Sequence, residues 1–248
     1  MYHQFKKLAD IDITKEPMEV GPTTHYMMGG VRVDADTQMS TVPGLFAAGE
    51  CGAGLHGANR LGGNSLSDLL VFGKRAGEYA AKFANENNAG TIDEKQITNS
   101  VNWALEGFER EKGDNPFDVQ HALQDMMQQL VGIVRNESEM QRAVEYLKLM
   151  RKRSENVRVT GNREYNTGWH TALDLTSLLT VSEAITIAAI ERKESRGAHF
   201  REDYPAKDEK NGKFNLIIYK DADGQMQIRK EISPEMRDDL KQIIQEMK

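Results

Sequence analysis

The sequence predicts an α+β protein with a glycine-rich segment of short strands and loops, an antiparallel helical bundle, and a small C-terminal β-hairpin followed by a helix. Three patterns predict this class. The small apolar run Leu45–Gly49 is typical of a buried strand, and the stretch from Gly49 to Gly63 holds six glycines. Apolar residues then recur every three or four positions over most of the later chain, which is helical spacing. Finally, Asp221–Gly224 has hairpin-turn chemistry between two strand-like runs.

The stretch from Pro43 to Ala76 has the parts of a ligand-binding site. Its predicted strand ends at an acid, Glu50, and the glycines beyond it let the backbone approach a flat ligand or a phosphate closely. A helix then begins, with Asn64 or Ser65 as N-cap and with Ser65 and Asp68 at capping-box spacing. Because a helix N-terminus offers unpaired N–H groups and partial positive charge, this arrangement predicts a ligand cradle. The loop carries three polar side chains: His56, Asn59 and Arg60.

Two shorter patterns precede this stretch. The pair Gly29-Gly30 followed by alternating Val31 and Val33 predicts a strand edge that lies against a ligand. The mostly polar segment 35–41 predicts a turn that leads into the strand at Leu45.

Beyond the linker Asn85–Gly90, the apolar pattern predicts a bundle of about four antiparallel helices. A closing helix is expected from Ser233-Pro234 to Lys248. Caps and apolar stripes mark the bundle helices: Ile97, Val101, Leu105 and Phe108 in the first, Asn115 with Pro116 at the start of the second, Ser138 with Gln141 as a capping box of the third, and a longest span from about Asn166 to Lys193.

Composition narrows the class of protein further. The 248 residues carry a net charge of −6, which argues against a nucleic-acid partner. The single cysteine, Cys51, excludes an internal disulfide framework, fits a reducing compartment, and is expected to be a small packed residue. The histidines show no metal-ligand spacing, so no metal site is predicted. No run approaches the roughly 18 consecutive apolar residues of a membrane span, so any membrane association must come through partners.

Three separated motifs resemble one family. GLFAAGE, HGANRLGGNSL and DLLVFGKRAG, within 44–77, resemble the C-terminal portion of the flavoprotein subunit of succinate dehydrogenase and fumarate reductase. GPTTHYMMGGV at 21–31 and ESRGAHFREDYP at 194–205 resemble two further signatures, in family order. The resemblance implies the C-terminal part of a Rossmann-like FAD-binding domain with substrate-site loops at 1–88. It further implies a helical bundle domain at 89–195 and a C-terminal tail with the hairpin and helix at 196–248.

The resemblance also implies roles for individual residues. Arg60 and His25 match the family's catalytic, substrate-binding arginine and histidine, and an arginine fork suits a dicarboxylate because it meets a carboxylate bidentately. Glu50 matches the acid that binds the ribityl part of FAD. Ser65 and the backbone of Leu66 match positions that contact the isoalloxazine ring, where a helix N-terminus stabilises the negative charge of reduced flavin. His56 is left open between lining the pocket and holding the loop.

The implied activity is oxidation of succinate to fumarate, or the reverse, with FAD as cofactor. The implied partners are an iron–sulfur subunit and, through it, a membrane anchor, which would place the chain peripherally on the cytoplasmic face of the membrane. A dinucleotide-binding domain normally begins with a strand that leads into G-x-G-x-x-G at a helix start, and we find no such opening. We therefore expect the chain to be a C-terminal piece whose missing N-terminal half is a further partner.

Two other functions compete with this one. A soluble L-aspartate oxidase is the nearest enzyme alternative, but Met28 and the sequence Gly62–Leu66 (GGNSL) favour the first interpretation. The chain could instead be a non-catalytic assembly fragment whose bundle docks on a partner. Arg196, His199 and Arg201 form a charged cluster that is expected to be a structural network or subunit contact rather than catalytic.

Overall fold

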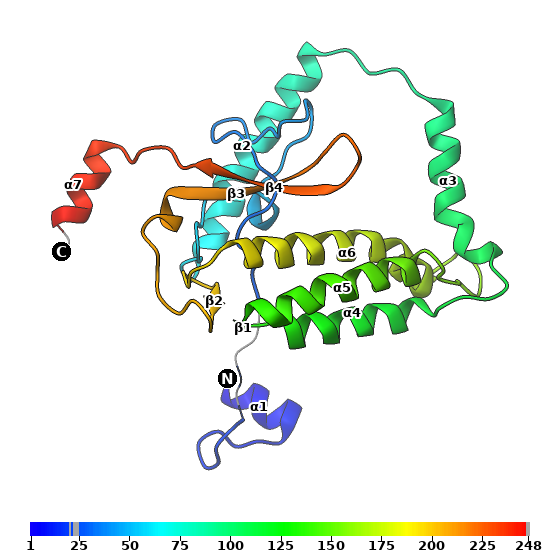
Figure 1. Ribbon diagram of the computed structural model, residues 1–248, viewed down its shortest axis with the longest axis horizontal. Helices are drawn as coiled ribbons and strands as arrows, with labels where there is room; N and C mark the ends of the chain where they lie inside the picture. The colour runs from blue at the N-terminus through cyan, green and yellow to red at the C-terminus, as the bar shows by residue number, and fades with distance from the viewer. Residues whose placement is uncertain (20, 22–24, 247–248) are drawn as a thin grey trace. The chain divides into compact units, whose positions relative to one another are not determined.

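The computed structural model describes residues 1–19, 21 and 25–246, and the chain forms two compact units, Met1–Gly77 and Glu78–Lys248. The division falls inside helix α2, Asn64–Glu86 (Figure 1). The predicted divisions near residues 88 and 195 therefore stay predictions. Three residues of the motif at 21–31, together with the predicted helix end at Lys248, lie outside the described residues: Pro22, Thr23 and Thr24.

The first unit is built mostly from loops. It begins with helix α1, Tyr2–Ala9, and its segments are then joined by single β-bridges, Val33 with Ser40 and Met39 with Phe46. The expected turn at 35–41 is confirmed by these antiparallel bridges. The predicted strand Leu45–Gly49 was wrong, because Phe46 makes one bridge and the chain then enters the 3₁₀ turn η1, Gly49–Cys51. A strand needs a ladder of backbone partners, and the described residues offer this segment only the Met39 side.

Gly30 has a packing reason for being glycine, and the predicted ligand contact of this segment stays a prediction. Its φ is +130°, and a Cβ at this position would lie 2.3 Å from the carbonyl oxygen of Cys51. Next to it, Val31 N donates to Cys51 O at 2.7 Å, and Ala53 N donates back to Val31 O at 2.9 Å. The glycine therefore lets two motifs pair through their backbones.

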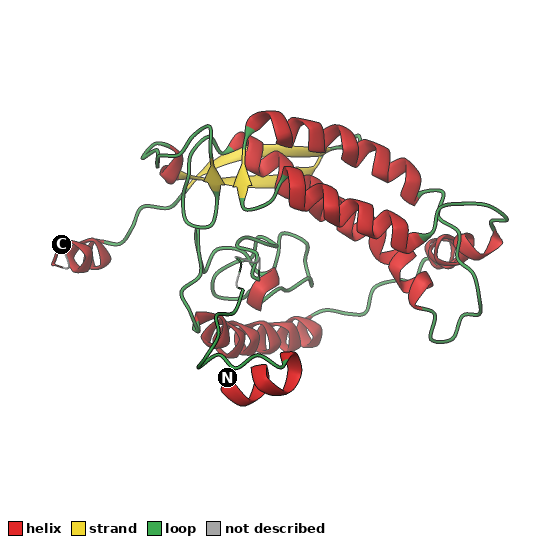
Figure 2. Ribbon diagram, turned by 90° about the horizontal axis from the view of Figure 1, so that it is seen from below, coloured by secondary structure: helices red, strands yellow, loops and turns green. Residues whose placement is uncertain are grey.

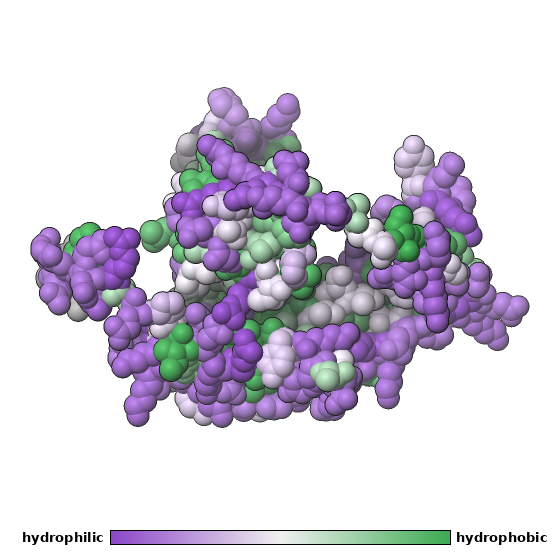
Figure 3. Space-filling model, turned by 90° about the horizontal axis from the view of Figure 1, so that it is seen from above, coloured by the Kyte–Doolittle hydropathy of each residue, from purple (hydrophilic) through white to green (hydrophobic). Residues whose placement is uncertain are grey.

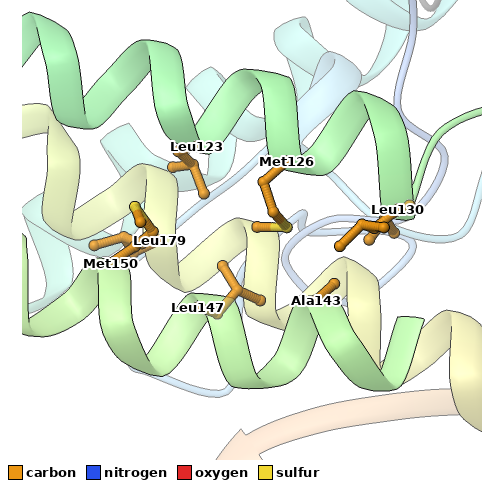
Figure 4. Packing of buried hydrophobic residues seen from close by; sticks show 8 residues of the cluster. Leu123, Met126, Leu130, Ala143, Leu147, Met150 and Leu179 are labelled. Atoms are coloured by element: carbon orange, nitrogen blue, oxygen red, sulfur yellow. The ribbon is translucent and has the colours of Figure 1, made fainter. Parts of the chain in front are cut away.

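The second unit is organised around three long helices: α4, Pro116–Leu130; α5, Glu137–Ser154; and α6, Thr167–Glu191. All three pairs of helices are in contact, and Figure 2 shows them as neighbouring long helices. Full burial of one such apolar side chain contributes roughly 1.5–3 kcal/mol, so this core stabilises the unit. The core residues come from all three helices (Figure 4): Leu123, Met126 and Leu130; Ala143, Leu147 and Met150; and Leu179.

Asparagine side chains start all three helices. Asn115 accepts from Phe117 N, with Pro116 at the first helical position, as the sequence predicted. Asn166, near which the longest helix was expected to begin, accepts from Trp169 N. The third prediction was wrong: Asn136, not Ser138, is the N-cap of α5 and accepts from Glu139 N. Asparagine is as good an N-cap as serine, and Asn136 lies two residues closer to the preceding strand.

Helix α3, Glu94–Glu109, lies at the edge of the bundle rather than inside it. Its contact with α6 is centred on Trp169, whose Nε1 donates to Ala104 O at 2.6 Å and whose ring meets Phe108 edge-on at 5.4 Å. The first half of the predicted apolar stripe, Ile97 and Val101, stays about half exposed. The bundle of about four helices is therefore three core helices and one peripheral helix.

The C-terminal part holds two small sheets. Strands β1, Val134–Arg135, and β2, Phe200–Arg201, pair in parallel. After the 3₁₀ turn η2, Asn211–Lys213, strands β3, Phe214–Lys220, and β4, Met226–Ile232, form the predicted antiparallel hairpin. The closing helix α7, Asp238–Glu246, starts later than predicted. Ser233 N instead donates to Lys213 O and extends the hairpin. Ser233 also precedes Pro234, and the residue before a proline disfavours helical backbone angles.

Helix α6 is long and apolar enough to cross a membrane by length and composition, although it holds no uninterrupted apolar run. It packs against α4 and α5, and Glu183 on it pairs with Arg151. These contacts are those of the central helix of a bundle. On the face shown in Figure 3, hydrophilic side chains predominate and apolar groups form scattered patches.

Candidate functional site

The centre of the candidate site is the guanidinium of Arg60, just before α2. Its Nη1 donates to Leu61 O at 3.3 Å and to Ser65 Oγ at 3.2 Å, so one corner is fixed to the start of the helix. Its Nε is buried and has no hydrogen-bond partner among the residues that the structure describes. Nε and Nη2 form the edge with which an arginine meets a carboxylate side-on. Arg60 is thus held on one side and has donors left for an anion on the other.

Tyr26 lies against this arginine. The Arg60 guanidinium carbon is 4.6 Å from the centre of the Tyr26 ring, and the ring meets that of His56 edge-on at 5.4 Å. The Tyr26 hydroxyl is buried without a hydrogen-bond partner in the described part of the chain. Burial raises the pKa of the Tyr26 phenol, and the negative charges of Asp68 and Glu50 raise it further. The phenol therefore stays neutral at physiological pH.

His56 and Asp68 form a buried pair beneath Tyr26. His56 Nε2 is 3.3 Å from Asp68 Oδ2, and the two side chains are 7% and 5% exposed. This pair shows that His56 holds the loop through a side-chain partner, and a role of His56 in lining the pocket stays a prediction. The predicted capping box of Ser65 and Asp68 was wrong. The Asp68 carboxylate pairs with His56, and the Ser65 hydroxyl oxygen accepts from Arg60.

Glu50 links the two motifs of the first unit. Its Oε1 accepts from Met27 N at 3.0 Å, while Oε2 accepts no hydrogen bond from another described residue. One carboxylate oxygen therefore fixes the segment that carries His25, and the other remains for a ligand hydroxyl.

His25 is brought to the site by its neighbour. Tyr26 contacts both His56 and Arg60, so the segment 25–31 and the glycine-rich loop meet at the start of α2. The His25 side chain itself is exposed and makes no hydrogen bond to the other described residues. The structure thus brings the two predicted substrate residues into neighbouring segments, without a contact between their side chains.

The remaining predicted residues lie at the N-terminus of α2. Ser65 uses its oxygen as an acceptor for Arg60, which leaves its hydroxyl proton for a ligand. Leu66 is well exposed, and its N–H already donates to Gly63 O. Cys51, expected to be packed, is exposed, with Sγ 3.3 Å from Ala48 O.

The sequence does contain a G-x-G-x-x-G pattern, contrary to our expectation. Residues 52–57 (GAGLHG) have this spacing. They lead into bends and turns, and α2 begins only at Asn64. The pattern is therefore not a dinucleotide-binding turn, in which the last glycines open a helix directly.

The charged cluster of the third motif is a structural network, as predicted. Arg201 is fully buried and donates to Asp203, Glu137 and the carbonyl oxygens of Ala189 and Ile190 at the end of α6. Hydrogen bonds from Arg201 hold the pKa of Asp203 at about 2. The network ties β2 to the ends of α5 and α6.

His199 and Glu194 complete this network. Arg135 can only donate, so His199 Nδ1 accepts from its Nη1 at 3.1 Å and Nε2–H donates to Arg192 O at 3.0 Å. Burial lowers the pKa of His199, which keeps the ring neutral. Burial alone would raise the pKa of Glu194, but hydrogen bonds from Arg196, Asp208 N and Arg192 lower it. Every group here is engaged within the fold.

Two residues of the site around Arg60, Tyr26 and Asp68, were not predicted from the sequence. Tyr26 lay inside a recognised motif but next to the residue of interest, and Asp68 was assigned to a helix cap. Residues 26, 56, 60 and 68 meet only through loop folding, so no local spacing could have grouped them. Among the described residues, no group of His, Cys, Asp and Glu side chains could hold a metal ion.

Two polar groups fit part of a flavin nucleotide. Glu50 has a carboxylate oxygen that can accept from ribityl hydroxyl groups, and the Ser65 hydroxyl can donate to a ligand at the start of α2. Comparison with known families agrees with this class of site: an FAD-binding domain matches residues 1–66. The fold and site thus define a flavoprotein.

A second family, the fumarate reductase flavoprotein C-terminal region, matches residues 120–242. An uncharacterized FAD-dependent oxidoreductase of Methanocaldococcus jannaschii is 39% identical over 88% of this chain and 39% of its own length. The fumarate reductase flavoprotein subunit of Haemophilus influenzae is 37% identical over 90% of this chain and 38% of its own. The chain belongs to the family of succinate dehydrogenase and fumarate reductase flavoprotein subunits.

A solved structure, the Mycobacterium smegmatis Sdh1 complex in the apo form, has a chain that is 45% identical, with a TM-score of 0.90 over 96% of this chain and 41% of that chain. The predicted fold class is confirmed by this match. The chain spans about two fifths of the length of these relatives.

Proposed function

We propose that this chain forms the substrate-facing, C-terminal part of an FAD-dependent enzyme that interconverts succinate and fumarate. The observation that carries the proposal is Arg60. Its Nη1 is fixed to the helix start, while its buried Nε has no partner among the described residues, and the same edge continues to Nη2. A buried donor without a partner costs about 1–3 kcal/mol, and a substrate carboxylate would satisfy it.

The residues divide the work as follows. Arg60 binds one carboxylate of the dicarboxylate through its fork, and His25, exposed on the neighbouring segment, binds the other. Glu50 and the hydroxyl of Ser65 hold the flavin, with the Leu66 backbone beside its ring. FAD, when bound, supplies the hydride chemistry. The residues of this chain orient the two carbons against it and restrain their motion, which is the main contribution of fixed binding groups.

The partners follow from the same proposal. The site lacks the dinucleotide-binding turn, so the rest of the FAD site comes from the portion of the relatives that this chain does not span. Electrons pass from the flavin to an iron–sulfur subunit and then to a membrane anchor, which places the assembly peripherally on the cytoplasmic face of the membrane. The Mycobacterium smegmatis Sdh1 relative is itself solved as a complex.

The test uses a chimera in which this chain replaces the matching two fifths of the Mycobacterium smegmatis Sdh1 chain. Succinate-dependent dye reduction, fumarate reduction and flavin content are measured. We expect turnover with both substrates. Arg60→Lys keeps the charge but loses the fork, and it should lower kcat/KM by roughly 10²–10³-fold, the scale of one lost transition-state donor. His25→Ala should weaken dicarboxylate affinity.

Arg75→Lys is the matched control. Arg75 lies on α2, pairs with the exposed Asp36, and is far more exposed than Arg60, so its substitution should leave turnover unchanged. Equal turnover of Arg60→Lys and the unsubstituted chimera at full flavin content would refute the assignment. A chimera that binds flavin but is silent toward both dicarboxylates would support the assembly-fragment function instead, and oxidation of L-aspartate would support the aspartate oxidase.

A further inference from the structure

The guanidinium of Arg60 is held at two points. One is the corner at Nη1, which binds Leu61 O and Ser65 Oγ. The other is its face, which lies over the Tyr26 ring with the central carbon 4.6 Å from the ring centre. Hydrogen bonds at Nη1 alone would leave the plane of the guanidinium group free to rotate about the side-chain torsions of Arg60. The ring contact is therefore the feature that fixes the plane, and with it the direction of the Nε–Nη2 edge.

The Tyr26 ring is itself fixed from behind. His56 meets it edge-on, with ring centroids 5.4 Å apart and planes at 83°. His56 is held by Asp68, and both side chains are less than a tenth exposed. Asp68 lies on α2, the same helix to which the Arg60 corner is bound. The chain of contacts from α2 through Asp68, His56 and Tyr26 to Arg60 thus starts and ends on one rigid element.

The hydroxyl of Tyr26 is buried near the carboxylate of Asp68, and both the burial and this negative charge raise the pKa of the phenol. It has no well-formed hydrogen bond to any residue in the described ranges, so it does not fix the position of the ring. The contribution of Tyr26 to Arg60 is therefore the negative face of its ring, which attracts a cation electrostatically and does so more strongly when water is excluded. A phenylalanine would provide the same face.

We propose that Tyr26 is a positioning residue for Arg60: its ring, set by the buried His56–Asp68 pair, orients the Nε–Nη2 edge toward the substrate carboxylate. The inference rests on the proposed function for the identity of that anion. The orientation of Arg60 can be measured without it. The consequence is that substrate affinity depends on a residue that does not touch the substrate.

The first experiment uses the full 248-residue chain and no ligand. Proton and nitrogen NMR of the Arg60 Nε–H group reports its position over the ring, because a proton above an aromatic face is shifted upfield. We expect the upfield shift in the native chain and in Tyr26→Phe, and its loss in Tyr26→Leu. Phe72→Leu is the matched control, since it removes the ring beneath Arg75 on the same helix and should leave the Arg60 signal unchanged.

The second experiment measures fumarate affinity in the flavin-loaded chimera described above, from the change in flavin absorbance. Tyr26→Leu should weaken fumarate binding by roughly 5–30-fold, the range of a desolvated cation–π contact, while Tyr26→Phe stays within about threefold of the native value. In an Arg60→Ala background, Tyr26→Leu should have no further effect, because Tyr26 acts through Arg60.

Several outcomes would overturn the positioning role. These are an unshifted Arg60 signal in the native chain, a Tyr26→Phe chain that loses the shift, or a Tyr26→Leu effect that persists undiminished without Arg60. The Tyr26→Phe arm decides the question even where Tyr26→Leu fails to fold. A chimera that binds no dicarboxylate would instead refute the proposed function, while the NMR arm would still decide the role of Tyr26.

Discussion

Replacing Arg201 with methionine should be the most costly single change in the second unit. The Arg201 side chain is fully buried, and its donors reach five acceptor atoms: Asp203 Oδ1 and Oδ2 at 2.7 Å each, Glu137 Oε2 at 2.8 Å, Ala189 O at 2.9 Å and Ile190 O at 3.2 Å. Methionine has a similar length but no donor. The substitution would therefore remove the cationic partner of two carboxylates, which keep hydrogen bonds from Glu137 N and Gln141, and the side-chain donor to two helix-end carbonyl groups.

The magnitude follows from how these acceptors can recover. Removing one partner of a buried ion pair costs about 3–5 kcal/mol, because an uncompensated charge is left behind. The carboxylates of Glu137 and Asp203 are 38% and 29% exposed, so water can reach both of them. We therefore expect the lower end of the range, about 3 kcal/mol.

Urea unfolding followed by circular dichroism of the helices measures this loss. With an m-value of about 2 kcal/mol/M, the midpoint should fall by roughly 1.5 M. Arg229→Met is the matched control: Arg229 also pairs with a carboxylate, Glu231, and lies over a ring, Tyr219, but it is half exposed. Its loss should cost less than about 1 kcal/mol.

Two results would refute this reasoning. One is an Arg201→Met midpoint within the range of the Arg229→Met control. The other is that Arg201→Lys, which keeps the charge but offers fewer directed donors, proves as stable as the native chain. Arg201→Lys also keeps the test decisive if the methionine variant does not fold.

Three further perturbations have defined outcomes. The pKa of Asp203 is about 2, below its ordinary 3.8, so its ion pair stabilises the fold fully above pH 3.8 and is lost as pH falls toward 2. Asp203→Asn should therefore flatten the fall of the unfolding midpoint between pH 5 and 2, and parallel curves would contradict this. Trp169→Phe removes the donor to Ala104 O, and amide exchange should quicken in α3 by the equivalent of about 1 kcal/mol while α4 to α6 keep their protection. Gly30→Ala would place a Cβ 2.3 Å from a backbone oxygen and should cost about 2 kcal/mol or more in a thermal melt, whereas Gly29→Ala, with open space around it, should cost less.

The order and type of the helices could be predicted from the sequence because those signals are local. Asn115 with Pro116 and Asn166 mark helix starts through bonds to residues two or three positions away, and the apolar spacing of α4 to α6 reports burial directly. The prediction of a helix cap failed where a residue with cap spacing found another partner that is distant along the chain. Asp68 has cap spacing to Ser65, yet it binds His56 across a loop.

The extent of each strand was also beyond a sequence prediction. The run Leu45–Gly49 has the composition of a strand, but ladder hydrogen bonds come from partners elsewhere in the chain, and Phe46 finds only Met39. Helix α3 shows the same limit, since its apolar stripe is present but only the end near Ala104 meets α6.

The sequence by itself determined the motifs and the family, because residue identity within a contiguous string is sufficient for these, and it predicted the arginine and histidine assigned to a dicarboxylate. Only the tertiary structure decided which donors of Arg60 are already used and which are left, and that Tyr26, His56 and Asp68 stand behind it. The physical reason is that hydrogen-bond satisfaction and ring contacts depend on positions in space. Loop folding sets those positions for residues that lie between 4 and 42 places apart along the chain.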